Sequence, residues 1–499
     1  MSTLSEPSFA PQAPARGEDT NRWLVLVLVC LAQFMVILDA TIVNVALPSI
    51  QRDLDFSETN LQWVINSYTL VFGGFLLLGG RAGDLFGRKR LFLAGLVLFS
   101  VASLLNGLSQ SGGMLIGARA LQGLGAALLS PAALSIITTT FAEGEERTKA
   151  MGVWSAIAAG GGAVGLLLGG VLTDALSWEW IFFVNVPIGV VALLLSMRYV
   201  PESIAPERPD TVDLPGAISV TAGLVVLVFA IVKAESYGWG SARTLGLGAL
   251  AVALLAAFVA IERRSPAPLI RLGIFRIRSL SSANAVLLLV AGGMYGFFFL
   301  STLYTQQVLG YSPIKAGLAF VPFTFGIVVG AGLAQQLARR INIRTVAAIG
   351  MTLATVGLLL LTGVPVNGHY ASDLLPAIIV MSIGMGLTFV PITLIATTNV
   401  GESDAGLASG IFNTSQQVGG ALGLAVLSTL AADRTSSYLS DLGHAPGRVD
   451  QLAGMVEGFQ LAWLVSAILV AVGAVLVLLI IRPRDVAGVN PEEVAVAGA

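Results

Sequence analysis

Residues 23–50 read WLVLVLVCLAQFMVILDATIVNVALPSI, an apolar run with one formal charge, Asp39. A helix needs about 20 apolar residues to cross the hydrocarbon core of a membrane, so this run predicts a membrane-spanning helix. A carboxylate inside hydrocarbon is costly unless it faces water, pairs with a cation or takes up a proton. Asp39 is therefore the first candidate for a functional residue.

The rest of the chain repeats this apolar pattern. Of its 499 residues, 55% are hydrophobic and 11% are charged, whereas soluble domains have about 25% charged residues. We therefore expect an all-α polytopic membrane protein with fourteen spans. The expected spans cover residues 23–50, 59–80, 91–109, 113–140, 150–173, 180–199, 214–232, 244–261, 281–308, 314–338, 345–363, 372–399, 405–431 and 459–481.

The basic residues indicate how these spans are oriented, because cytoplasmic loops carry an excess of Lys and Arg. With the N-terminus in the cytoplasm, 20 of the 27 basic residues fall in cytoplasmic segments, and Arg119 lies within a span. We therefore expect a multi-pass protein of the inner (plasma) membrane with both termini in the cytoplasm. Residues 1–21 and 482–499 are expected to be disordered cytoplasmic ends.

The composition disfavours several function classes. The formal net charge of −2 gives no basic excess for nucleic acid. Cys30 is the single cysteine, and His369 and His444 fall in expected outer loops, so a metal site is not expected. No Lys-Ser or Lys-Thr pair follows the glycines of 79–90, as a nucleotide-binding loop would require. We therefore expect neither an enzyme nor a bound cofactor.

The chain also contains an internal repeat. PAALSIITTTFAEGEERTKAMG (131–152) and PITLIATTNVGESDAGLASG (391–410) both run from a proline through Thr-rich apolar sequence into a short acidic loop. Repeated halves that meet around a site near the membrane midplane are typical of secondary transporters. We expect six-helix bundles over 22–200 and 281–481, joined by a linker (201–280) with two extra spans.

The loop between the second and third spans reads GGRAGDLFGRKR (79–90). Its glycines permit a tight turn, and its basic triplet favours the cytoplasmic side, which alone could explain the loop. The string also resembles the signature loop of the major facilitator superfamily, which latches one half of the protein onto the other. The resemblance assigns this latch to Gly80, Asp84, Gly87, Arg88 and Lys89.

The fourth span, with LIGARALQGLGAALLSPAALSII (115–137), carries the second intramembrane charge, Arg119. Gln122 lies one turn further on the same face. An arginine within a span is usually paired or faces a cavity, although one near the interface can extend its charge to the headgroups. The string resembles the fourth-span motif of drug:proton antiporters, in which the arginine is proposed to influence proton transfer.

The fifth span, GVWSAIAAGGGAVGLLLGGVLTD (152–174), has a face of small residues. Gly161, Gly165 and Gly169 recur every four residues, with Gly170 beside them, and such a face lets another helix approach closely. Ordinary tight packing would explain it. The span also resembles the glycine motif of the antiporters, but Leu166 stands where that motif has proline. We therefore expect the groove without the proline kink.

Other stretches extend the resemblance over most of the chain. LDATIVNVALPSI (38–50), VDLPGA (212–217), YTQQVLGYSPIKAGLAFVP (304–322) and AGLASGIFNTSQQVGGALGLAV (405–426) resemble the fourteen-span drug:proton antiporters of the EmrB/QacA-like family. The resemblance implies the major facilitator fold and an exporter of drugs or amphiphilic small molecules, and we expect the protein to be a monomer. Such a protein works by alternating access, with the proton gradient as energy source. A dedicated metabolite or lipid carrier of the same fold is the alternative.

Two roles stay open for Asp39. It couples transport to a proton, together with Arg119, or binds substrate; or it is structural and pairs permanently with Arg119 or caps a kinked helix. Polar residues of several spans are candidates for a central substrate cavity, although each could instead pack between helices: Gln33, Asn44, Gln122, Tyr304, Gln307, Asn413 and Gln417. The second half has no clear mid-span acid, which favours a neutral or monocationic substrate over a dication.

Overall fold

The computed structural model describes residues 21–141, 144–203, 213–401 and 404–486, and within these ranges every regular element is a helix. The long helices are α1 (Arg22–Asp53), α3 (Trp63–Phe86), α4 (Arg88–Gly107), α5 (Gly112–Thr140), α6 (Glu145–Ala175), α8 (Asn185–Tyr199), α9 (Leu214–Tyr237), α10 (Ala242–Arg264), α11 (Arg278–Leu303), α13 (Val321–Ala338), α14 (Ile343–Leu361), α15 (Leu375–Thr397), α16 (Ala405–Asp441) and α17 (Arg448–Ile480). The short helices are α2 (Glu58–Leu61), α7 (Trp180–Phe183) and α12 (Pro313–Ala319), with π-helical turns at Tyr304–Val308 and Tyr370–Leu374 and 3₁₀ turns at Leu272–Arg276 and Pro483–Val486.

Polar residues between the apolar runs start the helices. The Asn21 side chain accepts hydrogen bonds from the first amides of α1, and Ser111 and Ser241 cap α5 and α10 in the same way. Gly87, with φ +102°, makes the turn between α3 and α4 in a conformation that side chains disfavour. The chain therefore reverses direction where the sequence supplies these caps and turns.

Helices occupy all fourteen stretches that the sequence predicts to span the membrane. Twelve helical segments of the described chain are long and apolar enough to cross a bilayer. α6 and α16 are not among these twelve, so the exact number of fourteen spans stays a prediction.

The hairpin of α16 and α17 differs most from the sequence prediction. The expected spans leave an outer loop over 432–458, but α16 continues to Asp441 and α17 begins at Arg448. Arg434 pairs with Glu457 at 2.9 Å across this extension. Hydropathy misses such an extension because a helix outside the membrane needs no apolar surface.

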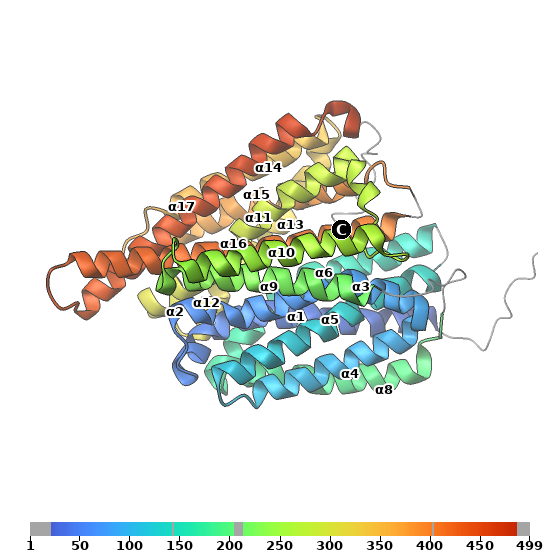
Figure 1. The fold of residues 1–499 in the computed structure, drawn as a ribbon, viewed down its shortest axis with the longest axis horizontal. Helices are drawn as coiled ribbons and strands as arrows, with labels where there is room; N and C mark the ends of the chain where they lie inside the picture. Colours follow the sequence, from blue (N-terminus) through green and yellow to red (C-terminus); the bar gives the residue numbers. More distant parts are fainter. Residues whose placement is uncertain (1–20, 142–143, 204–212, 402–403, 487–499) are drawn as a thin grey trace, which may run out of the picture.

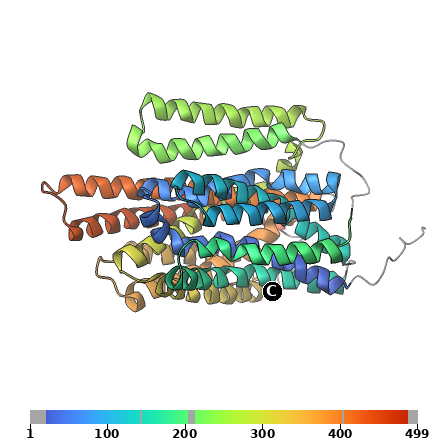
Figure 2. The same cartoon turned by 90° about the horizontal axis from the view of Figure 1, so that it is seen from below.

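Contacts divide the long helices into two groups. α1, α3, α4, α5, α6 and α8 pack on one another and form the N-terminal group, and α11 with α13–α17 forms the C-terminal group. The α9–α10 hairpin lies along one side of the molecule, where α9 contacts α3 and α16, one helix from each group (Figure 1, Figure 2). This is the expected architecture of two bundles with two inserted helices, while the boundaries at 200 and 281 stay a prediction.

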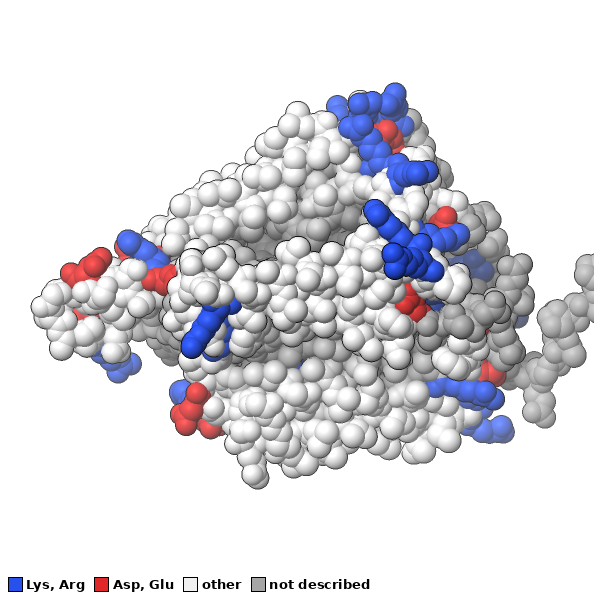
Figure 3. Space-filling model, in the orientation of Figure 1, with Lys and Arg blue, Asp and Glu red and all other residues white. Residues whose placement is uncertain are grey.

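The two ends of the bundle differ in their charged side chains. Lys and Arg gather at the end where α3 turns into α4 and α10 ends (Figure 3), and we call this the basic end. α1 begins and α17 ends there, and we call the opposite end, where α1 finishes at Asp53, the far end. That the basic end faces the cytoplasm stays a prediction.

Candidate functional site

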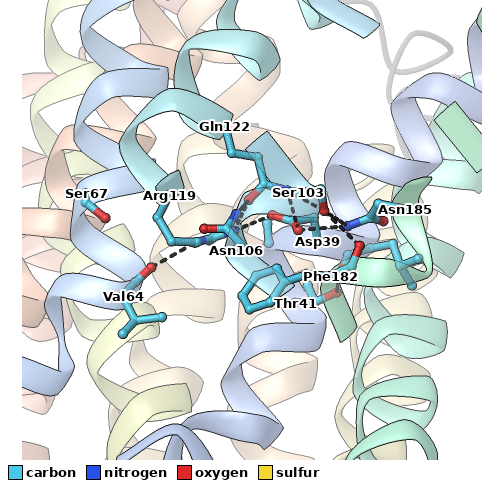
Figure 4. A network of polar contacts seen from close by, with 12 residues as sticks. Asp39, Thr41, Val64, Ser67, Ser103, Asn106, Arg119, Gln122, Phe182 and Asn185 are labelled. Carbon is cyan, nitrogen blue, oxygen red and sulfur yellow. Dashed lines mark hydrogen bonds and ion pairs between the residues drawn. The ribbon is translucent and has the colours of Figure 1, made fainter. Parts of the chain in front are cut away.

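Asp39 lies at the centre of a buried polar network in the N-terminal group. Its Oδ2 accepts from Arg119 Nη1 at 2.5 Å, and its Oδ1 accepts from Gln122 Nε2 at 2.8 Å and Asn185 Nδ2 at 2.9 Å (Figure 4). Asp39 and Arg119 are 0% and 1% exposed. In this conformation Arg119 therefore forms a direct ion pair with Asp39 and does not extend its charge to the headgroups. Because desolvation of two charges is costly, such a pair needs these additional hydrogen bonds.

A second layer of polar groups fixes the partners of the carboxylate. Ser103 Oγ donates to Phe182 O at 2.9 Å and accepts from Gln122 at 3.2 Å and Asn185 at 3.1 Å. Asn106 Nδ2 donates to Gln122 Oε1 at 2.7 Å. Four helices, α1, α4, α5 and α8, therefore contribute side chains to one connected network.

α3 holds the other side of Arg119. The Nε of Arg119 donates to Val64 O at 3.0 Å, and its guanidinium carbon lies 4.3 Å from the centre of the Tyr68 ring. Val64 and Tyr68 are one turn apart, so one face of α3 supplies both the carbonyl and the aromatic ring. The Tyr68 hydroxyl has no hydrogen-bond partner within the described ranges.

A cavity of about 700 Å³ lies between the two groups of helices. Gln33 and Trp154 from the N-terminal group and Tyr295, Asn413 and Gln417 from the C-terminal group line its inner part. Arg81, Asp84 and Arg271 line its mouth at the basic end. An apolar and aromatic wall with a few amides is typical of small-molecule sites.

Tyr68 separates this cavity from the ion pair. Tyr68 lines the cavity, as do Ala40 and Thr41, while Asp39 and Arg119 lie behind that wall. The pair is therefore adjacent to the cavity but closed off from it in this conformation. A movement of the Tyr68 ring would connect the two.

The two groups of helices touch at the far end. Gln306 Nε2 donates to Val45 O, and Gln307 Nε2 donates to Gln51 Oε1, both at 2.7 Å. Both glutamines lie on the π-helical turn that continues α11, and such turns occur often at functional sites. α12 also packs against α6, where Gly317 lies against Leu166 O. The cavity thus reaches the basic end and is closed toward the far end.

Comparison with known proteins gives this architecture a family. The family model described as Major Facilitator Superfamily matches residues 29–424. This chain belongs to the major facilitator superfamily. Membership makes it a multi-pass membrane transporter and not an enzyme. Its place in the fourteen-span antiporter subfamily stays a prediction.

Relatives and solved structures agree with the superfamily. The chain is 43% identical over 475 residues to the puromycin resistance protein pur8 of Streptomyces alboniger, covering 95% of this chain and 94% of that protein. It is 42% identical over 421 residues to the cephamycin export protein CmcT of Amycolatopsis lactamdurans, covering 84% and 86%. A bacterial homolog to the human lysosomal transporter Spinster has the same fold, with a TM-score of 0.65 at 16% identity over 94% of this chain and 98% of that one.

Only some of the seven polar residues that the sequence suggests for the cavity line it in the structure. Gln33, Asn413 and Gln417 line it, and Gln122 lies in the Asp39 network. The other three, which do not line the cavity, are Asn44, Tyr304 and Gln307. The Asn44 side chain donates to the carbonyl oxygens of Ala40 and Thr41 on its own helix. Tyr304 donates to Pro365 O, and Gln307 lies at the far end.

The glycine face of α6 packs against α1. A Cβ at Gly161 would lie 2.9 Å from Ile37 Cγ2, and one at Gly169 would lie 2.7 Å from Ile42 O. A Cβ at Gly165 would overlap Thr41 Oγ1. Gly170 faces α12 instead, where a Cβ would lie 2.7 Å from the Cα of Ile314. This face therefore lets α1 and α6 approach closely, and its role in transmitting motion stays a prediction.

The superfamily signature loop binds the end of α8 in this conformation. Asp84 pairs with Arg88 at 3.1 Å. The Lys89 amide donates to Glu202 Oε1 at 3.1 Å, and Lys89 Nζ donates to Met197 O at 2.9 Å. Gly80 and Asp84 also line the cavity. These bonds stay within the N-terminal group, so a latch between the two groups stays a prediction.

Sequence reasoning missed part of the network. Ser103, Asn106 and Asn185 are buried and hydrogen-bonded around Asp39, and Tyr68 covers Arg119. The only sequence signal was that Asn106 and Asn185 are polar residues in apolar runs. Many residues near the ends of spans are also polar, so this signal does not single them out. Their convergence depends on how α4 and α8 pack on α1, which local sequence does not encode.

Proposed function

We propose that this transporter is a proton-coupled exporter of drugs or other amphiphilic small molecules that works by alternating access at the central cavity. The observation that carries the proposal is the cavity between the two helix groups, whose wall includes the Tyr68 ring that lies against the buried ion pair of Asp39 and Arg119. A carboxylate in such a place can exchange a proton for substrate when the wall moves. The resistance and export proteins named among its relatives support the direction of transport.

The lining of the cavity supports an amphiphilic substrate of low charge. Its inner part combines aromatic rings with amides, such as Trp154, Tyr295 and Gln417. The charged residues that line it are Arg81, Asp84 and Arg271, all at the mouth. Asp84 is paired with Arg88, so the described lining residues offer no free carboxylate that would attract a dication.

The coupling step rests on exchange of partners at Asp39. In the conformation described, Arg119 and two amides satisfy the carboxylate. Opening of the far end requires α1 to part from the Gln306 and Gln307 side chains, and α1 carries Asp39. Movement of α1 against α5 then separates the carboxylate from Arg119, after which a proton compensates its charge. Reprotonation and release on opposite sides of the membrane make the exchange directional.

A reconstituted system tests the proposal. Proteoliposomes with the transporter are given an imposed pH gradient, and uptake of puromycin is followed with and without a protonophore. We expect gradient-driven transport by the wild-type protein, and none above background by Asp39→Asn. Gradient-driven transport by Asp39→Asn would refute the coupling role. If a panel of amphiphilic drugs, including a cephamycin, is not carried, the dedicated metabolite or lipid carrier replaces the drug exporter.

A further inference from the structure

The α9–α10 hairpin carries a second buried acidic site, at the basic end and outside the Asp39 network. Asp213 caps the start of α9, and Glu262 lies in the last turn of α10. They are 5% and 4% exposed. One oxygen of each is satisfied: Asp213 Oδ1 accepts from the Gly216 amide at 2.8 Å, and Glu262 Oε2 accepts from the Ile270 amide at 3.0 Å.

The other oxygens of the two carboxyl groups have no partner. Asp213 Oδ2 and Glu262 Oε1 are buried and make no hydrogen bond to any part of the chain that the structure describes. Both groups face Gly216: a Cβ there would lie 2.9 Å from Asp213 Cγ and 2.9 Å from Glu262 Oε1. Two buried carboxylates on either side of one glycine repel each other, and a proton on Glu262 relieves this repulsion.

Among the residues that the structure describes, the charges around this pair do not balance two carboxylates. Arg81 of α3 is the cation that acts on Glu262, and the following segment contributes only the backbone amides of Leu269 and Ile270. Arg81 Nη1 is engaged by Pro268 O at 2.9 Å. Within the described ranges, one arginine therefore faces two carboxylates, and a proton on Glu262 removes the remaining negative charge.

The segment after α10, residues 265–271, crosses the mouth of the cavity, and we call it the strap. It is held at three points: the Ile270 amide binds Glu262, Pro268 O accepts from Arg81, and Arg271 pairs with Asp404 at the start of α16. Leu269 packs against Leu78 and Ala217, and it also lines the cavity with Arg271. The strap therefore joins both helix groups through the inserted hairpin.

We propose that Glu262, beside the Asp213 carboxylate, is a proton-binding site that fastens the strap across the basic-end mouth of the cavity. With the proton bound, the pair is compact and Glu262 holds the Ile270 amide. When the proton leaves, the two carboxylates repel each other, Arg81 is drawn from Pro268 toward them, and the strap is released. The site gives the inserted hairpin a role in opening and closing the mouth, and it does not depend on what the cavity carries.

Proton linkage gives the site a measurable signature. If release of the strap requires loss of one proton, its opening equilibrium rises about tenfold for each pH unit. Glu262→Gln keeps an acceptor for Ile270 and offers an N–H to Asp213, so it mimics the protonated pair at every pH. Asp213→Asn does the same from the other side, and asparagine caps a helix as well as aspartate.

Hydrogen–deuterium exchange on the full-length protein in nanodiscs tests the proposal without any transport assay. Protection of peptides covering 265–271 is measured from pH 6 to pH 9, with correction for the base-catalysed intrinsic rate. We expect wild-type protection to fall with rising pH, and Glu262→Gln and Asp213→Asn to stay protected throughout. Glu146→Gln, at an exposed acid of α6 paired with Arg22, is the matched control and should follow the wild type. Wild-type protection that does not change with pH, or amide variants that keep the wild-type pH slope, would overturn the proposal.

Discussion

The pair of Asp39 and Arg119 leads to a double-mutant prediction. Asp39→Asn leaves the Arg119 guanidinium buried without its counter-charge. It also sets a new amide N–H against Gln122 or Asn185, which both donate to the carboxylate. Arg119→Gln in turn leaves Asp39 with two neutral donors and no cation. Each single substitution breaks a buried pair, which costs about 3–5 kcal/mol of unfolding free energy.

The double variant Asp39→Asn/Arg119→Gln removes both charges together. Unlike either single variant, the double variant leaves no buried charge without its counter-charge, so it should be more stable than either of them. The expected interaction energy is therefore about 3 kcal/mol or more in favour of the pair. Equilibrium unfolding by SDS in mixed micelles, followed by helical circular dichroism, measures all four proteins.

Additive effects would refute this reasoning. If the losses of the two single variants sum to the loss of the double variant within about 0.5 kcal/mol, the two charges do not interact in the folded protein. Transport by the same four proteins separates the two roles of Asp39. A purely structural pair predicts that the double variant, once stable, regains gradient-driven transport. A coupling carboxylate predicts that it stays inactive.

Three further predictions concern the walls around the cavity. Tyr68→Ala removes the ring between the cavity and the ion pair and should raise the substrate-free proton leak of proteoliposomes, measured with an internal pH dye. Tyr68→Phe keeps the ring and should leave the proton leak at the wild-type level. Equal leaks in Tyr68→Ala and Tyr68→Phe would show that the ring is not the barrier. Gly165→Ala should cost about 1–3 kcal/mol by overpacking α1 against α6, seen as a lower SDS unfolding midpoint. Gly160→Ala, which meets nothing within 4 Å and has the higher helix propensity, should not lower the midpoint. Gln306→Ala loses one bond across the far end and should raise far-end opening about 2- to 12-fold, measured by labelling of a far-end cysteine reporter in a Cys30→Ser background. An unchanged labelling rate would show that this bond does not hold the far end closed.

The sequence predicts the ion pair well because charges are rare in hydrocarbon. Asp39 and Arg119 are visible as exceptions in apolar runs, and the cost of burying each alone predicts a partner. Asn185 could not be assigned in this way. A neutral amide near a span end is cheap to bury or expose, so its place beside Asp39 follows only from the packing of α8 on α1.

Helix periodicity fails where the helix itself changes. The π-helical turn at Tyr304–Val308 holds an extra residue, which rotates the following side chains by about 100° relative to a continuous α-helix. A polar residue that the regular period directs toward the cavity can therefore point elsewhere. Gln307 instead donates to Gln51 at the far end. The sequence YTQQV (304–308) contains no residue type that predicts a π-helical turn.

Two buried acidic sites thus lie behind residues that line one cavity, and they differ in what balances their charge. Asp39 has a dedicated cation and two amide donors, so its proton occupancy changes only when a change of shape removes Arg119. In the part of the chain that the structure describes, Asp213 and Glu262 face one cation, Arg81, which binds Pro268 O, so in our proposal the proton on Glu262 controls the strap directly. The first site therefore responds to the conformation, and the second sets it at the mouth. In Asp39→Asn, hydrogen-exchange protection of the strap should therefore depend on pH as it does in the wild type. Loss of this pH dependence would show that the two sites act as one.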